Sequence, residues 1–320
     1  MRPSFKAAWW LPGAHLPTIW GKKFRRQPTV HDRCERIATP DGDHLTLARM
    51  GRARAGTPHL LILHGLEGTI RAKYAHGLLS RARARGWSGD LLLFRSCDGE
   101  LNTAPRLYHS GETTDLDLVV RWLHAETPRL RLVICGVSLG GNVLLKWLGE
   151  SGEQAAAVVE RAAAVSVPFD LAAGSRHLER GFSRAYTRHF LSTLRPKALA
   201  KARQFPGILD ERGIASARSF WDFDDAATAP LHGFRDAADY YRQSSSIGLL
   251  GKIRVATTLL SSRDDPFVPP DVLEAVAKLG TESPHLTLNF TDRGGHVGWV
   301  EGHPWHPSYY MDRFVVDALG

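Results

Sequence analysis

The chain has 320 residues, of which 43% are hydrophobic, and it carries a net charge of +8. This size fits one large domain with an insertion or two smaller domains, and no stretch reaches the roughly 18 uncharged apolar residues that a membrane span needs. The basic excess comes without a nucleic-acid-binding motif, so we expect no nucleic-acid partner. Three cysteines, Cys34, Cys97 and Cys135, are too few for a closed disulfide framework, and we predict a cytoplasmic protein in which they stay reduced.

The first 31 residues form an arm of distinct composition. Its six basic residues, which no acidic residue accompanies, are Arg2, Lys6, Lys22, Lys23, Arg25 and Arg26. Trp9, Trp10 and Trp20 lie among them, and basic residues interleaved with tryptophan are typical of transient contact with a membrane surface. We favour the alternative that the tryptophans pack the arm onto the domain. The apolar run of the arm is too short for a signal peptide.

Short apolar segments alternate with helical patterns, which predicts a mostly parallel sheet with crossover helices. The expected strands are Arg33–Thr39, His44–Arg49, Leu60–His64, Asp90–Arg95, Leu130–Gly136, Ala162–Val167, Arg254–Ser261 and Leu286–Phe290. The expected helices are Ala72–Arg85, Thr113–Glu126, Gly141–Glu150, Pro270–Leu279 and Ser308–Leu319. A Pro-Asp-Gly turn joins the first two strands, which we therefore expect to be antiparallel. The prediction is an α/β fold with an eight-stranded, mostly parallel sheet and helices on both faces.

A long segment between the sixth and seventh strands breaks this alternation. Residues 170–251 are rich in arginine, alanine and aromatic side chains and have a helical pattern. A loop of that length without secondary structure is unusual, so we expect a helical insertion that covers the carboxyl edge of the sheet as a lid. The predicted core is then residues 1–169 and 252–320.

Residues 136–140 read Gly-Val-Ser-Leu-Gly and fit the pattern Gly-x-Ser-x-Gly. They follow the expected strand Leu130–Gly136 and precede the expected helix Gly141–Glu150. A nucleophile elbow requires this context, because a tight strand-to-helix turn exposes the serine hydroxyl beside the free N–H groups of the helix. We predict that Ser138 is the catalytic nucleophile; the plainer alternative is a glycine-rich turn without a chemical role.

A serine nucleophile needs a base, and the base needs an acid that orients it; in this arrangement both follow the serine, acid first. Asp264 and Asp265 follow the expected strand Arg254–Ser261. We choose Asp265 as the acid because it opens the Pro-Phe-Val-Pro turn, with Asp264 as the alternative; both could instead cap the next helix. The predicted base is His296, because glycines on both sides let the backbone bring its imidazole over Ser138.

The expected oxyanion-hole donors are the backbone N–H groups of Leu139, directly after the nucleophile, and of Leu66, in the His-Gly-Leu-Glu-Gly loop after the third strand. His303 and His306 lie close to His296 in the sequence, which suggests metal ligands. Glycine and proline interrupt the helix that would align them, so we expect no metal site, and the chemistry needs no cofactor. We interpret His303 and His306 as surface or packing residues.

Four polar side chains lie in the loop after the fourth strand, and these are Asn102, Tyr108, His109 and Ser110. They either line the substrate pocket or fix the loop by hydrogen bonds. We favour the second role.

Together, seven segments resemble the YheT-like branch of the α/β-hydrolase superfamily. They are residues 10–19, 64–68 with Tyr74, 95–102, 106–111, the elbow with Gly141-Asn142, 264–267 and 294–298. That branch includes bacterial cytosolic hydrolases, fungal acyltransferase/esterases that make and cleave medium-chain ethyl esters, and animal membrane-anchored lipases. The resemblance implies the α/β-hydrolase fold and assigns the triad to Ser138, Asp265 and His296. The chain departs from the family pattern at Pro17, where glutamine is usual, and at Ser96, where glycine is usual.

Three functions fit this site. The first is a serine carboxylic-ester hydrolase that acts through an acyl-enzyme on a small-molecule ester or lipid. Apolar and aromatic residues in the insertion suggest a short- to medium-chain acyl group. The second function is acyl transfer from the same acyl-enzyme to an alcohol, and the third is non-catalytic binding on a hydrolase fold. The presence of serine, aspartate and histidine in the required order argues against the third.

Overall fold

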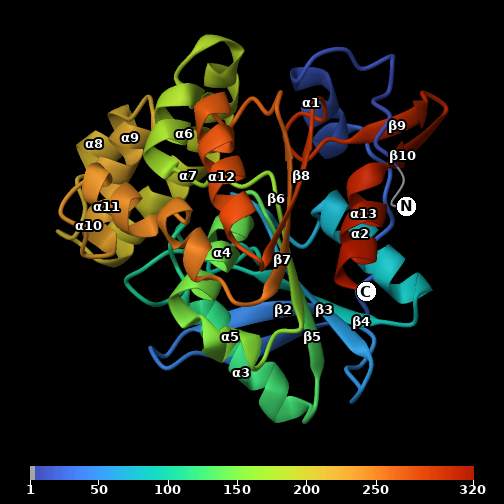
Figure 1. Cartoon of the computed structure of the whole chain (residues 1–320). Helices are drawn as coiled ribbons and strands as arrows, with labels where there is room; N and C mark the ends of the chain where they lie inside the picture. The colour runs from blue at the N-terminus through green and yellow to red at the C-terminus, as the bar shows by residue number, and fades with distance from the viewer. Residues whose placement is uncertain (1–3) are drawn as a thin grey trace.

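The structure, a computed structural model, describes residues 4–320 around an eight-stranded sheet (Figure 1). Its strands are β1 (Arg33–Ala38), β2 (His44–Met50), β3 (Pro58–Leu63), β4 (Ser88–Leu93), β5 (Arg131–Val137), β6 (Arg161–Val165), β7 (Ala256–Ser262) and β8 (Leu286–Thr291). Their order is β1-β2-β4-β3-β5-β6-β7-β8. β2 runs antiparallel to both β1 and β4, and all other neighbours are parallel. The predicted mostly parallel sheet with an initial antiparallel hairpin is confirmed.

The central strands consist of continuous apolar runs, as expected for parallel strands that are buried on both faces. Leu60, Leu61, Ile62 and Leu63 of β3 are fully buried, and the segment 132–135 of β5 is buried to the same degree. Because every residue of β5 after Arg131 is buried in packed protein, the backbone that leads to Ser138 has little freedom to shift.

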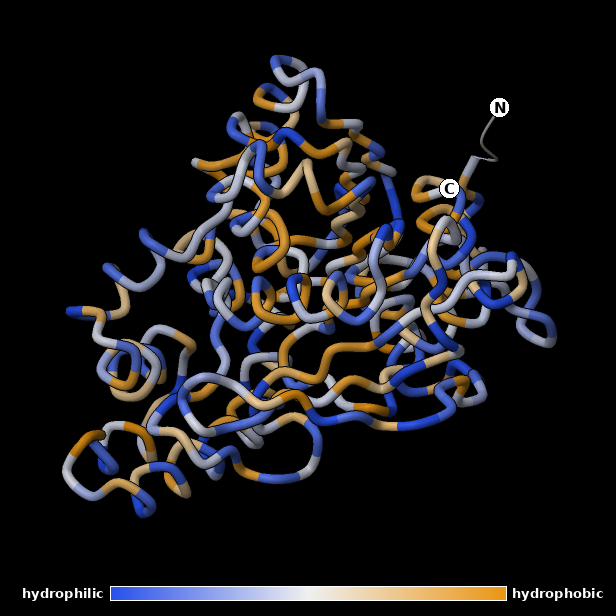
Figure 2. Tube along the Cα trace, turned by 90° about the horizontal axis from the view of Figure 1, so that it is seen from below, coloured by the Kyte–Doolittle hydropathy of each residue, from blue (hydrophilic) through white to orange (hydrophobic). Residues whose placement is uncertain are grey.

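Helices cover both faces of the sheet. Outside the insertion they are α1 (His15–Lys23), α2 (Lys73–Ala84), α3 (Thr114–Glu126), α4 (Leu139–Ser151), α5 (Glu153–Ala156), α12 (Pro270–Glu282) and α13 (Tyr310–Leu319). One core cluster joins the sheet to α3, α4 and α12, and a second joins its opposite face to α2 and α13. In α3 the buried positions Leu116, Val119, Val120 and Leu123 have the spacing of one helical face. Hydrophobic residues accordingly gather along the inner elements in Figure 2, whereas many outer turns are hydrophilic.

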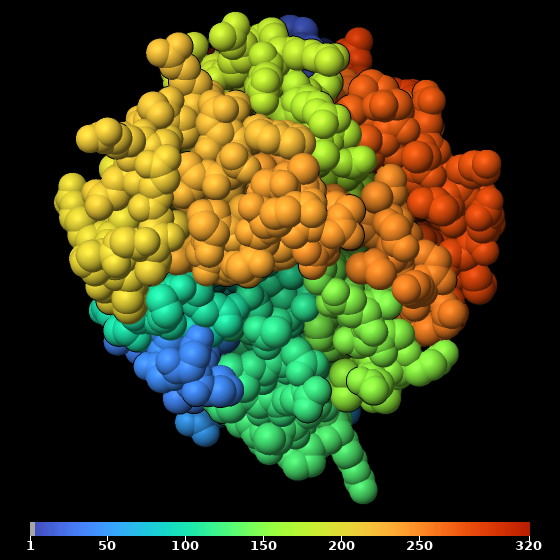
Figure 3. Space-filling model, turned by 90° about the vertical axis from the view of Figure 1, so that its left-hand side faces the viewer, coloured from blue at the N-terminus to red at the C-terminus, as the bar shows by residue number. Residues whose placement is uncertain are grey.

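The segment between β6 and β7 is helical, as expected. It contains α6 (Leu171–Leu178), η1 (Gly181–Ser183), α7 (Arg184–Gln204), α8 (Glu211–Ser216), α9 (Phe220–Phe223), η2 (Asp224–Thr228), α10 (Ala229–Leu231), α11 (Ala237–Ser244) and η3 (Ile247–Lys252). These helices have a small core of their own around α7, α8 and α9. Seen from the side, they form the surface above the elements of the first half of the chain (Figure 3). The division into a core and a lid at residues 170 and 251 stays a prediction.

The C-terminal region contains a two-stranded sheet that the sequence patterns did not predict. β9 (Val300–His303) and β10 (His306–Tyr309) form an antiparallel hairpin across Pro304 and Trp305. The predicted helix Ser308–Leu319 therefore begins two residues too early, since α13 starts at Tyr310. Strands of four residues with glycine and histidine carry too little alternation to be recognised from the sequence.

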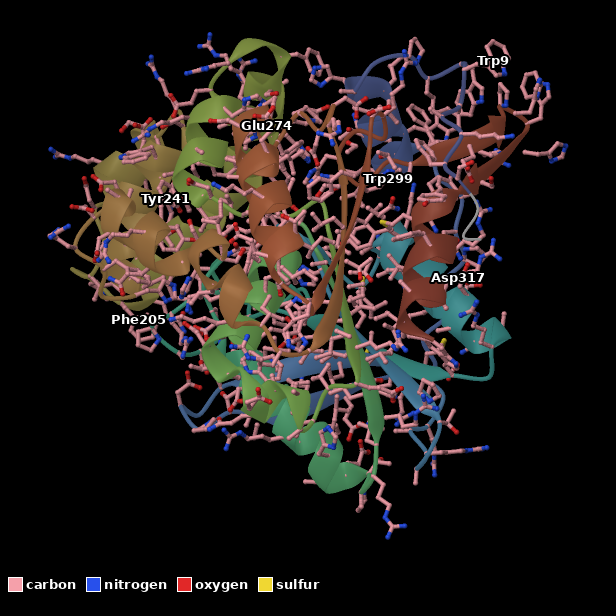
Figure 4. The ribbon with its side chains drawn as sticks, in the orientation of Figure 1. Trp9, Phe205, Tyr241, Glu274, Trp299 and Asp317 are labelled. Atoms are coloured by element: carbon pink, nitrogen blue, oxygen red, sulfur yellow. The ribbon has the colours of Figure 1, made fainter. Side chains whose placement is uncertain are left out.

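The arm before β1 packs against the rest of the molecule. The Trp10 and Trp20 rings meet edge to face at 4.6 Å, and Trp10 Nε1 donates to the Gly302 carbonyl at 2.9 Å. Trp9 is 76% exposed and lies at the outer edge of the molecule (Figure 4). The favoured packing therefore holds for two of the three tryptophans, and membrane contact stays a prediction. Arg2 lies outside the described residues.

The sequence features that remain are the three cysteines and the expected absence of a membrane-spanning helix. The three cysteine thiols are free, with Cys97 and Cys135 buried and Cys34 exposed. Within residues 4–320, no helix combines the length and the apolar character needed to cross a membrane.

A buried ion pair fastens the arm to the last helix. Arg25 Nη1 donates to Asp312 Oδ1 at 3.1 Å, a second bond joins the same two side chains, and the guanidinium lies 4.0 Å from the Tyr309 ring centroid. Burial raises the pKa of Asp312, and the Arg25 charge acts against that rise. A carboxylate at this position therefore depends on its arginine partner.

We expect Arg25→Ala to lower the free energy of unfolding by about 3–5 kcal/mol, because it leaves the Asp312 charge buried without a partner. Urea denaturation of the variant and the parent protein measures this difference. Arg26→Ala is the matched control, since Arg26 is exposed, and should change stability by less than about 0.5 kcal/mol. Equal effects of the two substitutions would contradict the role given to the ion pair.

Candidate active site

Ser138 occupies the tight turn between β5 and α4. Its φ angle is +54°, a conformation that residues other than glycine rarely adopt. A Cβ on Gly136 would lie 2.4 Å from the Gly140 carbonyl oxygen, and one on Gly140 would lie 2.5 Å from the Leu63 carbonyl oxygen. Both positions therefore require glycine, which explains the Gly-x-Ser-x-Gly pattern in steric terms.

The structure brings the three predicted triad residues together. Ser138 Oγ lies 2.9 Å from His296 Nε2, and His296 Nδ1 lies 2.9 Å from Asp265 Oδ2 and 3.0 Å from Oδ1. With a proton on Nδ1, the imidazole donates to the carboxylate and accepts the proton of the serine hydroxyl through Nε2. Asp265 is buried and also accepts a hydrogen bond from the Phe267 N–H at 2.8 Å.

Several hydrogen bonds fix the loop that carries His296. The Gly295 N–H donates to Asp264 Oδ1 at 2.8 Å, so Asp264 holds the loop and does not contact the imidazole ring. The His296 N–H donates to Thr18 Oγ1 at 2.8 Å, which makes helix α1 of the arm a support for the site. The imidazole also stacks on the Phe267 ring with a centroid distance of 4.0 Å. Hydrogen bonds therefore fix the backbone of the loop and the Nδ1 atom of His296, and stacking on Phe267 fixes the face of the imidazole ring.

The loop after β3 holds Leu66 between two anchored neighbours. The Gly65 N–H donates to the Tyr74 hydroxyl at 2.8 Å, and the Glu67 N–H donates to the Tyr108 hydroxyl at 2.7 Å. Within residues 4–320, the Leu66 N–H donates to no protein acceptor. Its two neighbours are fixed while its own donor is free, which is the condition that an oxyanion donor must meet.

The same loop lies directly against the serine. A Cβ on Gly65 would lie 3.2 Å from the Ser138 Cβ, and His64 supports the turn by donating from Nδ1 to the Gly65 carbonyl at 2.7 Å. Burial lowers the pKa of His64 to about 4, so this imidazole is neutral and has a structural role in the turn. On the opposite side, Leu139 is the first residue of α4, and in the described part of the chain its N–H has no protein acceptor either.

The triad opens onto an apolar pocket with a cavity volume of about 140 Å³. The loop after β3, the loop before α3 and the insertion all contribute to its wall. Eight of its apolar side chains come from the insertion, namely Leu171, Leu178, Phe190, Leu194, Phe220, Phe223, Ala227 and Leu231. A cavity with apolar walls next to a polar catalytic group is typical of small-molecule sites.

An ion pair connects the insertion to the loop after β3, which carries the predicted oxyanion donor Leu66. Lys197 of α7 donates to Glu67 Oε1 at 2.6 Å, and the Tyr108 hydroxyl donates to the same oxygen at 2.8 Å. Burial is the largest single influence and acts against ionisation of Glu67, but the Lys197 charge and the hydrogen bonds from Lys197, Tyr108 and Thr193 together outweigh it and lower the pKa of the carboxyl group. The residue next to Leu66 is therefore held by a helix that lies about 130 residues later in the chain.

All four polar loop residues take part in hydrogen bonds that fix their loop or its neighbour, as favoured, and three of them also line the pocket. Asn102 fixes the loop, because its Nδ2 donates to Asp43 Oδ2 at 2.7 Å and to the Arg106 carbonyl at 2.8 Å. The other three, Tyr108, His109 and Ser110, line the pocket.

His303 and His306 pair across the β9–β10 hairpin and are both exposed. Within residues 4–320, no three His, Cys, Asp or Glu side chains are grouped so that they could hold a metal ion.

Sequence reasoning missed two residues that contact the site. Thr18 lies within a segment whose family resemblance was noted, but only the folded chain places its hydroxyl at the His296 backbone. Lys197 is one of many cations in the insertion, and a lone lysine in a helix usually belongs to a solvated face. Nothing in the local sequence distinguishes it.

Comparison with known proteins identifies the family of the chain. The alpha/beta hydrolase fold family model matches residues 58–302. The chain is 39% identical over 309 residues to the Escherichia coli protein named "Putative esterase YheT", which covers 95% of this chain and 89% of that protein. It is 29% identical over 317 residues to human phospholipase ABHD3 (93% and 76%) and 30% identical over 262 residues to the monoacylglycerol lipase of Saccharomyces cerevisiae (78% and 57%). A solved structure of the Pyrococcus furiosus esterase Pf2001 shares the fold, with a TM-score of 0.57, 17% identity and coverage of 93% and 97%.

The chain therefore belongs to the alpha/beta hydrolase fold family and, within it, to the YheT-like branch. It is an enzyme of the esterase and lipase type, a serine hydrolase. The family and the class of enzyme predicted from the sequence motifs are confirmed.

The two neighbouring aspartates give a direct test of the site geometry. Asp265→Ala should lower kcat for ester hydrolysis on the order of 10⁴-fold, because the imidazole loses the group that fixes its tautomer. Asp264→Ala should lower it only about tenfold, since it removes one hydrogen bond to the His296 loop. Steady-state kinetics of both purified variants against the parent protein measures the difference. A larger loss of kcat in Asp264→Ala than in Asp265→Ala would mean that Asp264 is the triad acid.

Proposed function

We propose that this enzyme hydrolyses carboxylic esters with short- to medium-chain acyl groups through an acyl-enzyme on Ser138. The observation that carries the proposal is the continuous chain of hydrogen bonds from Asp265 through His296 to Ser138, which faces an apolar pocket. The names of the relatives, which include an esterase, a phospholipase and a monoacylglycerol lipase, fit an ester or lipid substrate.

In the first half of the reaction, Ser138 Oγ attacks the ester carbonyl carbon while His296 Nε2 takes the hydroxyl proton. The carbonyl oxygen becomes an oxyanion and accepts hydrogen bonds from the Leu66 and Leu139 N–H groups. As the tetrahedral intermediate collapses, His296 gives the proton to the leaving alcohol oxygen. The acyl group then remains bound to Ser138 as an ester.

In the second half, water attacks the acyl-enzyme and His296 accepts one of its protons. The second tetrahedral intermediate expels Ser138 Oγ, which takes the proton back from the imidazolium. The carboxylic acid leaves and the enzyme returns to its starting state. Throughout, Asp265 stabilises the imidazolium by accepting the hydrogen bond from Nδ1.

The apolar lining of the pocket supports the proposal of a short- to medium-chain acyl group. The aromatic and aliphatic side chains of the insertion bury each methylene of an acyl group with a gain of about 0.8 kcal/mol, which favours chains that reach along the wall. No cofactor takes part in this scheme. Acyl transfer to an alcohol would proceed through the same acyl-enzyme, with the alcohol in place of water.

Hydrolysis of p-nitrophenyl esters from acetate to laurate tests the nucleophile. Ser138→Ala should lower kcat/KM on the order of 10⁵-fold, because the nucleophile is lost while binding groups remain. Ser192→Ala, which removes an exposed serine of α7, is the control and should retain full activity. Equal rates in the parent protein and Ser138→Ala would refute the role of Ser138, and ethyl ester formation in added ethanol would favour acyl transfer.

A substitution in the pocket wall tests the placement of the acyl chain. Leu231 lines the cavity and is only half-buried, so Leu231→Trp narrows the pocket without replacing a core residue. The ratio of kcat/KM for laurate to that for acetate should fall at least tenfold, because a long chain loses its space and a short chain does not. An unchanged ratio would place the acyl chain elsewhere.

A further inference from the structure

The pocket contains a carboxyl group that the triad does not use. Asp224 is the first residue of η2, a turn of π-helix within the insertion, and such turns occur frequently at functional sites. Tyr241, which lies among the helices of the insertion (Figure 4), donates its hydroxyl to Asp224 Oδ2 at 2.6 Å, and Thr228 donates to Oδ1 at 2.5 Å. Asp224 lines the pocket, and as a whole residue it is partly exposed.

This carboxyl group has no positive partner. Within residues 4–320, no lysine, arginine or histidine lies within ion-pair distance of Asp224, although most buried carboxylates in this structure have one. Burial raises the pKa of Asp224 to about 6, and the bonds from Thr228 and Tyr241 oppose the rise only in part. A buried carboxylate that accepts two hydroxyl bonds still has lone pairs to offer to a third donor.

Two histidines that line the same pocket are neutral. The His109 and His232 rings lie 4.4 Å apart, and burial lowers the pKa of His109 to about 4 and that of His232 to about 2. In the described part of the chain, the His232 ring has no hydrogen-bond partner. Neither imidazole therefore supplies a charge that would balance Asp224.

An unsubstituted acyl chain fits this arrangement poorly. If hydrocarbon covered the accessible face of Asp224, the carboxylate would lose its water without gaining a bond, which costs more than the loss of an ordinary hydrogen bond. A chain that carries its own donor would replace the water and keep the carboxylate satisfied. The apolar walls would still bury the methylenes between the ester and that donor.

We propose that Asp224 accepts a hydrogen bond from a hydroxyl or ammonium group on the acyl chain, and that the enzyme selects esters of hydroxyacyl or aminoacyl chains over plain chains of equal length. This inference rests on the proposed function, because it places the acyl group in the pocket beside Ser138. Asp224 is a specificity residue in this scheme and takes no part in the bond changes.

The test compares methyl esters of plain, ω-hydroxy and ω-amino acids with 6 to 12 carbons. At the length that reaches Asp224, kcat/KM of the parent protein should be at least tenfold higher for a donor-bearing ester than for the plain ester. Asp224→Leu should bring this ratio to about one. Asp224→Asn keeps a carbonyl acceptor but loses the charge, so it should retain a preference for hydroxyl and lose one for ammonium.

Tyr241→Phe is the matched control for a purely structural role of Asp224. It removes a partner of the carboxyl group but leaves the carboxyl group in the pocket, so the preference should persist. Because each ratio is taken within one protein, a variant that folds incompletely still gives a valid value. Ratios near one at every length in the parent protein, with plain esters hydrolysed, would overturn the inference and leave the proposed function intact.

Binding measured without catalysis separates the two proposals. In Ser138→Ala, calorimetry should give a Kd at least fivefold lower for the preferred ω-hydroxy or ω-amino methyl ester than for the plain ester of the same length. If the parent protein hydrolyses no ester but this difference in Kd is present, the proposed function fails and the binding role of Asp224 stands. Equal Kd values would overturn the role of Asp224 whatever the outcome of the kinetic assay.

Discussion

The site depends on the steric constraint at the turn between β5 and α4. Ser138 adopts a φ of +54° there, and Gly136 and Gly140 are both too close to backbone oxygen atoms to carry a side chain. The strain is tolerable because β5 is buried on both faces and α4 is packed in the main core, so the flanking elements fix the turn between them. All other site residues are placed with respect to this one fixed hydroxyl group.

Two loops from separate parts of the chain converge on that hydroxyl group. The His296 loop is held by Thr18 of the arm and by Asp264, and the loop after β3 is held by the two tyrosines Tyr74 and Tyr108. None of these supports is adjacent in sequence to the group that it holds. The geometry of the proposed triad is therefore a property of the whole fold, even though the triad itself consists of only three side chains.

The sequence allowed the sheet, the order of its strands along the chain and the cluster of triad residues to be predicted, because each depends on a local pattern. The Gly-x-Ser-x-Gly pattern after an apolar run reflects the lack of space for side chains at Gly136 and Gly140. The glycines before His296 reflect a similar lack of space in its loop. The β9–β10 hairpin and the Lys197–Glu67 pair were missed, since four-residue strands lack a clear pattern and a pairing across about 130 residues leaves no local trace. Ser96, where the family usually has glycine, has a φ of +61°, a conformation that favours glycine. In this chain, hydrogen bonds between the Ser96 hydroxyl and Asn102 hold the turn instead.

The contact between Lys197 and Glu67 has a thermodynamic consequence for the insertion. Movement of α7 away from the pocket would separate an ion pair whose carboxylate also receives the Tyr108 hydroxyl, and the backbone beside Leu66 would lose part of its anchor. The Lys197–Glu67 pair therefore couples the position of α7 to that of the Leu66 N–H, the proposed oxyanion donor. By linkage, a ligand that binds better when this N–H is anchored would also stabilise α7 in its contact with the loop, by the same coupling free energy.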